Sequence, residues 1–387
     1  MGLAVGNALL DVDPSYRVCI SEKEDRIGAH TSTRNSGVLH AGFYYSTDSL
    51  KARFCVEGNS LMTLYVKEKN LALRNIGKVV IAKNESEYER LLVLLDRGVV
   101  NGSSIELLQP SALKSIEPLA QTNFPFIWSP RTSVVDPSSV MQSLTSDFIS
   151  RGGEIYLRST AQISSDDHSV IVAGSTLDVG LVINLAGNHA LSIAKSVGVG
   201  EDLGLLPVLG AYRETMHKNL PLTSLVYPVP HPVNPFLGVH LTPTVRGTVK
   251  VGPTALPVLG PEQYSLLGRL HLRHLLESLS SLQRLGRMQS ATIMAILKTE
   301  FPYLFLDKIL NDVAQLVPRA RESSGWKRLK PGIRAQLINR KSGEFISDFL
   351  VRREKNVMHV LNVVSPGFTS ALSFGKYIAE RAVSKDR

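Results

Sequence analysis

Apolar and polar positions in the first twenty-two residues predict a helix followed by a strand. The stretch GLAVGNALL has small and apolar residues at helical spacing, and residues 18–20 form an apolar run that leads to Glu22. A helix that runs into a strand ending in an acid is typical of the second half of a nucleotide-binding βαβ unit. The pattern therefore predicts a nucleotide-binding segment at this end of the chain.

Helical spacing returns at residues 55–69 and 85–100, and the apolar run GKVVIA between them predicts a strand. The stretch ELLQPSALKSIEP predicts a turn and a short helix.

A second α/β segment is predicted in the middle of the chain. Residues 179–184 predict a buried strand, Ala186 and Gly187 a tight turn, and Asn188 the cap of the next helix. Two residues of low bulk let a flavin or an adenosine approach the backbone, although a plain strand-to-helix turn gives the same pattern.

Strand-like alternation broken by prolines covers residues 222–256, and helical spacing covers residues 262–316. The chain closes with a strand, a hairpin, a strand ending near Asn362, a Ser-Pro-Gly turn and a helix. Nucleotide-binding segments thus stand at the start, the middle and the end. This order predicts a discontinuous cofactor domain with a second domain threaded through it.

Composition and charge narrow the class of protein. The 387 residues are 43% hydrophobic and 20% charged, which is ordinary for a globular protein. The net charge of +9 favours an anionic partner, but it is spread along the chain, so we rank nucleic acid below an anionic metabolite. Two isolated cysteines allow no disulfide framework, which favours a reducing compartment, and no pattern indicates a metal site.

Two further positions suit a dinucleotide. The carboxylate of Glu22, with Lys23 beside it, stands where an acid binds ribose hydroxyls, unless it is simply a solvated charge. The turn SPGFT precedes the last helix, and the N–H groups and dipole of a helix N-terminus suit a pyrophosphate or a reduced flavin. Ordinary capping by Ser365 or Thr369 is the alternative.

The stretch RNSGVLHAGFYY holds the densest group of candidate residues. A turn of small residues leads to a histidine and two tyrosines, and lysine and arginine follow at residues 51 and 53. A histidine between glycine-containing turns is a candidate for proton transfer, although most single histidines are structural. Arg334 lies in the apolar stretch PGIRAQL, so it needs either an internal acid or a substrate carboxylate as its partner.

These motifs together resemble the FAD-dependent L-2-hydroxyglutarate dehydrogenases of the glycine/D-amino-acid oxidase superfamily. The resemblance rests on RNSGVLHAGFYY, SLKARFCVEG, YPVPHPVNPFLGVHLT, VKVGP, PGIRAQLINRKSGEFISDF and SPGFTSALSFGKYI, which occur in order over nearly the whole chain. Several long segments are far more specific than one glycine fingerprint.

The resemblance implies an α/β fold with a Rossmann-like FAD domain and a substrate domain of mixed β-sheet plus helices. We place the FAD domain at residues 1–70, 130–205 and 335–387, and the substrate domain at 71–129 and 206–334, with a helical insertion at about 262–316. It further implies oxidation of L-2-hydroxyglutarate, a small dicarboxylic 2-hydroxy acid, to 2-oxoglutarate by hydride transfer to FAD. It implies an electron acceptor that the sequence does not specify, a mitochondrial location in eukaryotes and, as a further hypothesis, peripheral membrane association.

The resemblance also assigns residues to the site. His40 is expected near the flavin and the reacting carbon, His240 and Tyr227 on the facing sheet, and Arg334 on a substrate carboxylate. Which histidine is the base stays open. The residues expected to bind FAD are Gly2, Glu22, Lys23, Asn35, Ser36, Gly37, Gly42, Ala186, Gly187, Ser365, Pro366, Gly367 and Thr369.

The chain departs from the family in three places. The family opens with a strand and G-x-G-x-x-G, of which Gly2 matches the third glycine, so we expect an N-terminally truncated version with weakened FAD binding. VLGAYR lacks a cation and an acid that the family tends to have, and HLTPT lacks a cation. Arg213 and Arg246 are the nearby candidates to compensate. Two alternatives remain: a related FAD-dependent amine or hydroxy-acid oxidoreductase, and a non-catalytic remnant.

Overall fold

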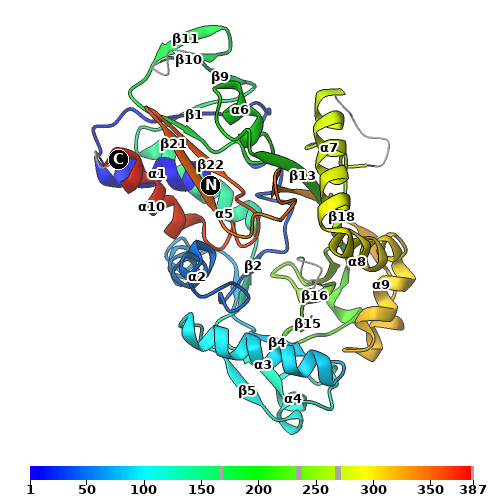
Figure 1. The fold of residues 1–387 in the computed structure, drawn as a ribbon. Coiled ribbons are helices and arrows are strands. Elements are labelled where there is room, and N and C mark those ends of the chain that lie inside the picture. The colour runs from blue at the N-terminus through cyan, green and yellow to red at the C-terminus, as the bar shows by residue number, and fades with distance from the viewer. Residues whose placement is uncertain (165–168, 232–237, 266–271, 385–387) are drawn as a thin grey trace.

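The computed structural model describes residues 1–164, 169–231, 238–265 and 272–384 (Figure 1). Helices and strands interleave along these residues, as expected for an α/β fold. The elements form two parallel strand pairs packed on helices, one eight-stranded sheet and several smaller sheets.

The first layer contains two separate parallel pairs of strands. β1 (Cys19–Ser21) pairs with β8 (Glu154–Tyr156), while β12 (Val182–Asn184) pairs with β22 (Val357–Leu361), and β21 (Leu350–Glu354) extends the second pair antiparallel. Among the described residues, β1 and β12 are not hydrogen-bonded to each other. The parallel strands thus form two ladders rather than one continuous sheet.

Apolar helices cover these ladders. α1 is buried on all sides from Leu3 to Leu10, and it packs against α10 in the first layer (Figure 1). The helices of this layer are α1 (Gly2–Val12), α2 (Leu50–Glu68), α5 (Pro137–Ser150), α6 (Ala190–Ser196) and α10 (Ala371–Val383). Two small sheets adjoin it: β2 (Val38–Leu39), β7 (Ser133–Val135) and β3 (Leu73–Arg74), and β9 (Ala161–Ile163), β10 (Ser169–Val172) and β11 (Ser175–Asp178).

The eight-stranded sheet forms the opposite wall of the molecule. Its order is β19 (Lys327–Arg328), β14 (Arg213–Met216), β17 (Thr248–Gly252), β16 (His240–Pro243), β15 (Leu225–Pro228), β4 (Lys78–Ile81), β6 (Phe126–Ser129) and β5 (Glu106–Leu108). Side chains alternate between its faces, so Val79 and Ile81 pack with α4 (Pro110–Ile116) and α9 (Leu306–Val313). Val80 points to the other face, toward α3 (Glu85–Val100).

A third sheet connects the two walls. β13 (Leu203–Gly210) pairs along its whole length with β20 (Gly332–Asn339), and β18 (Leu256–Pro257) extends it. Helices α7 (Leu272–Met288) and α8 (Ser290–Glu300) lie beside this sheet (Figure 1). Short 3-10 helices cover Gly187–His189 (η1), His217–Asn219 (η2), Phe301–Leu304 (η3) and Pro318–Arg321 (η4).

The predicted elements are confirmed except at a few positions. The helix predicted from residue 55 begins at Leu50, where the Ser49 side chain accepts a hydrogen bond from the Ala52 N–H. The Asn188 cap is wrong, because its Nδ2 atom instead donates to the Pro261 carbonyl, 2.7 Å away. Residues 232–237 of the predicted strand region and 266–271 of the helical insertion lie outside the described residues.

Candidate active site

A large cavity lies between the two walls. Its volume is about 2190 Å³, well above the roughly 300–1,000 Å³ of common small-molecule sites. Residues of α1, β1, β12 and β20 line it together with the segments around 34–46 and 363–369. This volume accommodates a dinucleotide and a small acid at the same time.

Most of the predicted site residues line this cavity. The lining includes His40, Tyr227, His240 and Arg334, together with Gly2, Glu22, Lys23, Asn35, Ser36, Ala186, Gly187, Ser365, Pro366, Gly367 and Thr369. Segments far apart in the sequence therefore meet around one space.

Gly37 and Gly42 are not among the lining residues, contrary to their predicted place at the cofactor. Both have positive φ angles, and a Cβ atom on Gly37 would lie 2.4 Å from the Val135 carbonyl oxygen. A Cβ atom on Gly42 would lie 2.6 Å from a methyl carbon of Val56. Close packing of the chain on itself explains these two glycines.

Features at one end of the cavity fit an adenine dinucleotide. The first turn of α1 carries neither an acid nor a side-chain cap, so its N–H groups are available to a phosphate. Glu22 follows β1, and one of its carboxylate oxygens accepts a hydrogen bond from the Glu24 N–H at 3.0 Å. Uncapped N–H groups beside an acid at a strand end are what a pyrophosphate and a ribose require.

The turn before α10 is also free of side-chain capping. The predicted alternative of capping by Ser365 or Thr369 is wrong, because α10 begins after Ser370 with no side-chain cap. The Thr369 hydroxyl instead accepts a hydrogen bond from the His40 N–H at 3.1 Å and donates to the Val38 carbonyl at 3.3 Å. Thr369 therefore fixes the backbone that carries His40.

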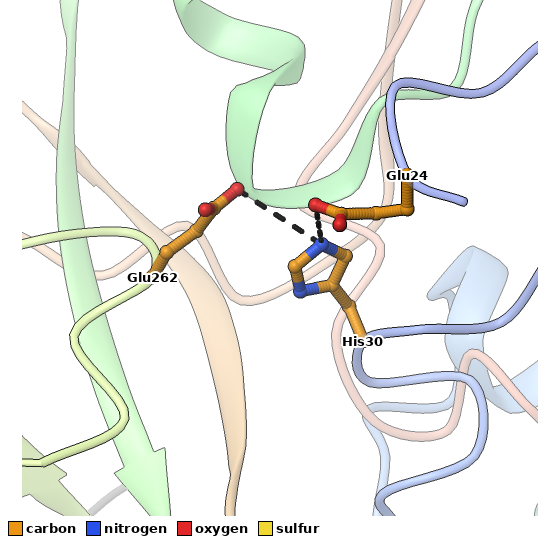
Figure 2. Close-up of side chains that lie close together, drawn as sticks. All are labelled: Glu24, His30 and Glu262. Carbon is orange, nitrogen blue, oxygen red and sulfur yellow. Dashed lines mark hydrogen bonds and ion pairs between the residues drawn. The ribbon is translucent and has the colours of Figure 1, made fainter. Parts of the chain in front are cut away.

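Lys23 lies in a cluster of charged side chains at the rim. Figure 2 shows His30 between Glu24 and Glu262, with its Nε2 atom 2.9 Å and 3.9 Å from their carboxylate oxygens. The Lys23 ammonium forms ion pairs with Glu24 and, at 2.5 Å, with Glu262. The carboxylates and the imidazole have the composition of a metal site, but a lysine already supplies the positive charge there. Lys23 therefore lines the cavity with two partners within the protein, and its contact with the cofactor stays a prediction.

His240 and Tyr227 form a stacked pair on adjacent strands of the eight-stranded sheet. Their ring centroids lie 3.7 Å apart at an interplanar angle of 16°. The Nδ1 atom of His240 lies 2.9 Å from the Gly238 carbonyl oxygen, so Nδ1 carries the proton and donates it. The Nε2 atom therefore carries the lone pair, and among the described residues it has no partner.

Burial keeps both histidines unprotonated. It lowers the pKa of His240 to about 3, and the charges of Lys78 and Arg334 act in the same direction. Burial also lowers the pKa of His40 well below its usual range, and the charge of Lys78 and the neighbouring His240 act in the same direction. Each imidazole is thus in the form that accepts a proton.

Arg334 lies on β20 opposite Val208, and its side chain reaches the cavity. Its charge lowers the pKa of His240, and it also counteracts the effect of burial on the pKa of Tyr212. A guanidinium in this position can bind a carboxylate bidentately beside the two histidines.

The two cations that were expected to compensate for the family departures lie elsewhere. Arg246 forms an ion pair with Asp136 at 2.6 Å, and Arg213 lies on β14 beside Arg328. Neither is among the residues that line the cavity. These two arginines therefore do not replace, at the cavity, the cations that VLGAYR and HLTPT lack.

The sequence did not single out Lys78 or Tyr212. Lys78 is fully buried among aromatic rings near both histidines, and Tyr212 lines the cavity. A lysine at the start of an apolar strand has the pattern of a solvent-exposed charge at the strand end, and Tyr212 lies in VLGAYR, which differs from the family pattern. No pattern in the sequence identifies either residue.

Comparison with known proteins agrees with this geometry. Residues 1–381 match the family described as FAD dependent oxidoreductase. The chain is 32% identical to L-2-hydroxyglutarate dehydrogenase of Indibacter alkaliphilus, with 100% of this chain and 97% of that protein covered. It is 31% identical to the mitochondrial L-2-hydroxyglutarate dehydrogenase of Caenorhabditis elegans (100% and 91% covered) and to the Escherichia coli K12 enzyme (98% and 90%).

Solved structures show the same fold. L-alpha-glycerophosphate oxidase of Mycoplasma pneumoniae with FAD bound has a TM-score of 0.72 at 23% identity, with 99% of this chain and 92% of that chain covered. L-proline dehydrogenase of P. horikoshii has a TM-score of 0.73 at 15% identity, with 98% and 90% covered. At these identities the likeness concerns the fold alone.

Proposed function

Because this chain belongs to the FAD-dependent oxidoreductase family and, within it, to the L-2-hydroxyglutarate dehydrogenases, we propose that it oxidises L-2-hydroxyglutarate to 2-oxoglutarate. The observation that carries the proposal is His240, which lines the cavity with its Nε2 lone pair unpartnered among the described residues. Oxidation of an alcohol requires such a proton acceptor beside the reacting carbon.

The protein's own groups handle the proton and the charges of the substrate. His240 Nε2 accepts the hydroxyl proton, and the Gly238 carbonyl holds the ring in the required tautomer. The Arg334 guanidinium binds one carboxylate of the substrate. The dianion in turn raises the pKa of His240 from its low value, which strengthens this base when substrate is present.

FAD fits the residues at the other end of the cavity. The N–H groups at the start of α1, including that of Gly2, would hold the pyrophosphate, and the Glu22 carboxylate the ribose. The turns at Ala186–Gly187 and at 365–369 would lie against the remaining parts of FAD. When bound, FAD supplies the acceptor for the hydride that leaves the hydroxyl-bearing carbon.

A substrate panel tests the proposal. Flavin-loaded protein is mixed anaerobically with L-2-hydroxyglutarate, L-lactate, glycine, L-proline and glycerol 3-phosphate, and flavin absorbance is followed. We expect bleaching by L-2-hydroxyglutarate at the lowest concentration. Preferential bleaching by an amino acid or by glycerol 3-phosphate would favour a related oxidoreductase, and no bleaching by any compound would favour a non-catalytic protein.

Membrane association and location in the cell are further parts of the proposal. Among the described residues, no helix is both long and apolar enough to cross a membrane. We propose that the protein associates peripherally with a membrane. Exposed apolar side chains along α8, η3 and the start of α9 support this: Met294, Leu297, Phe301 and Phe305. A mitochondrial location stays a prediction, because the similar enzymes include both mitochondrial and bacterial proteins.

A further inference from the structure

Lys78, which takes no part in the proposed proton transfer, is buried behind the wall of the cavity. Its side chain is 0% exposed, and its Nζ atom lies 4.4, 4.5 and 4.9 Å from the ring centroids of Phe43, Tyr44 and Tyr227. Within the described part of the chain, Nζ has no hydrogen-bond partner. The group that counteracts the effect of burial on the pKa of Lys78 is the Cys55 thiol rather than a carboxylate.

The fold holds Lys78 firmly in this place. It is the first residue of β4, and its backbone pairs with Leu225 of β15 on one side and Ser129 of β6 on the other. Because side chains alternate along a strand, Lys78 shares the face of Val80, which packs against Phe43 and Tyr227. Its side chain cannot reach solvent without disrupting this face.

Packing alone does not account for a lysine here. Burial lowers the pKa of Lys78 to about 7, which means that the ammonium form is disfavoured in these surroundings. Aromatic faces offset only part of the lost hydration. A methionine would fill the same volume without an uncompensated charge, so a purely structural role gives no reason for an amine.

The groups around Lys78 belong to the candidate active site. Tyr44 and Tyr227 line the cavity, and Tyr227 stacks on His240. The charge of Lys78 lowers the pKa of both His40 and His240. The titratable groups that face it are thus Cys55 of α2, Tyr44 of the loop after β2, Tyr227 of β15 and His240 of β16, with His40 close by.

We propose that Lys78 is a positioning residue of the substrate site, whose ammonium group acts through the Tyr44 and Tyr227 rings as the counter-charge of a dicarboxylate. Lys78 does not touch the substrate in this arrangement. The inference rests on the proposed function, which places a dianion beside two histidines that must stay unprotonated. A positive charge behind the wall attracts the dianion and disfavours protonation of the histidines.

The test uses glutarate, which lacks the hydroxyl group and cannot be oxidised, and butyrate, which has one carboxylate. Both are titrated calorimetrically into flavin-loaded wild type, Lys78→Met and Lys83→Met at about pH 6. Lys83, two residues after the end of β4, is the matched control, because its Nζ atom already lies 3.4 Å from the Asp312 carboxylate. We expect Lys78→Met to bind glutarate about 10- to 30-fold more weakly and butyrate at most about threefold more weakly. Glutarate affinity within about twofold of wild type would overturn the proposal.

A second readout does not depend on substrate. The pKa of Lys78 is about 7 in the folded protein and 10.5 ordinarily, so the unfolded chain binds more protons between these values. The free energy of unfolding of wild type therefore rises as pH rises through this window. Lys78→Met lacks this rise, and we expect it to be more stable than wild type at low pH. Identical pH profiles of the unfolding midpoint would overturn the proposal.

These measurements separate the inference from the proposed function. If no 2-hydroxy acid bleaches the flavin, the proposed function fails, yet the glutarate and stability comparisons still decide the role of Lys78. Should Lys78→Met not fold, wild type alone provides the test. Its glutarate affinity should fall more steeply than its butyrate affinity as pH rises from about 6 to 9, and equal slopes would overturn the proposal.

Discussion

Single residues at the cavity owe their chemistry to burial and to one or two neighbours each. His240 is 4% exposed, and the Gly238 carbonyl fixes its tautomer. The ring can therefore accept a proton only at Nε2. Thr369 positions the backbone of His40 from a segment more than three hundred residues away.

Replacement of His240 tests its assignment as the proton acceptor. We expect His240→Gln to slow anaerobic flavin reduction by roughly 10²- to 10⁴-fold, the range typical of a lost general base. Flavin content and glutarate affinity should stay near wild type, because glutamine is neutral and similar in volume to the unprotonated imidazole. A loss below about tenfold in stopped-flow measurements would assign the base to another group, with His40 as the next candidate.

The low pKa of His240 also predicts an acid-sensitive fold. Its pKa is about 3 in the folded protein and 6.5 ordinarily, so its contribution to stability is full above pH 6.5 and is lost as pH falls toward 3. We expect the free energy of unfolding to fall by roughly 2–3 kcal/mol from this group between about pH 6.5 and 4.5. Denaturant titrations of wild type and His240→Gln would measure it, and parallel pH profiles would refute the assignment.

The sequence indicates some of these residues better than others. His40, His240 and Arg334 stand in long recognisable segments, and all three line the cavity. Lys78 carries no such indication, because its environment forms only when Phe43, Tyr44 and Tyr227 fold over β4. Gly37 and Gly42 were predicted at the cofactor but serve packing, because the sequence does not distinguish a glycine needed for packing from one needed by a ligand.

At the scale of elements, the approach of α2 to the turn before α10 positions one side of the cavity. A Cβ atom on Gly58 of α2 would lie 2.4 Å from the Thr369 carbonyl oxygen and 2.8 Å from the Ser370 Cα atom. Asn59 of the same helix donates to the carbonyls of Leu39 and His40, both at 3.1 Å. The helix and the turn therefore hold the His40 segment from two sides.

A glycine-to-alanine pair tests this contact. Gly58→Ala should destabilise the protein by about 1–3 kcal/mol, because backbone atoms must move to admit the methyl group. Gly286→Ala in α7 is the control, since nothing lies within 4 Å of its Cβ position. Alanine there should stabilise by roughly 0.5–1 kcal/mol. Chemical denaturation measures both, and equal effects of the two substitutions would contradict the account.

Long elements follow from periodicity, whereas short ones do not. The helical spacing at residues 85–100 corresponds to α3, and the Asn84 side chain caps it. Strands of two or three residues, such as β2, β3 and β7, are too short for any alternation to appear. Asn188 matched a capping pattern, but its side chain instead donates a hydrogen bond to the carbonyl of Pro261, far along the chain.

At the scale of the whole molecule, two walls enclose the cavity, and each is built from distant parts of the chain. The order of helical and strand-like segments predicts such threading. It does not predict that β1–β8 and β12–β22 form separate ladders, because pairing depends on contacts that local patterns do not encode. The division into two domains with the stated boundaries stays a prediction.

The exposed apolar side chains beside α9 predict binding to membranes. Phe301 and Phe305 are 60% and 65% exposed, and Lys298 and Lys308 lie nearby in sequence. We expect the protein to co-sediment with vesicles containing anionic lipid, and the double substitution Phe301→Ser and Phe305→Ser to weaken this several-fold. Val99→Ser with Val100→Ser removes exposed apolar surface from α3 as the control. Equal binding by both double variants would exclude this patch as the membrane contact.

The most direct test of the central claim is the visible spectrum of the flavin-loaded protein, recorded anaerobically before and after addition of L- or D-2-hydroxyglutarate. The account predicts a flavin spectrum that the L enantiomer bleaches rapidly and the D enantiomer does not, with 2-oxoglutarate formed in a one-to-one ratio to reduced flavin. A flavin spectrum that L-2-hydroxyglutarate leaves unchanged would contradict it.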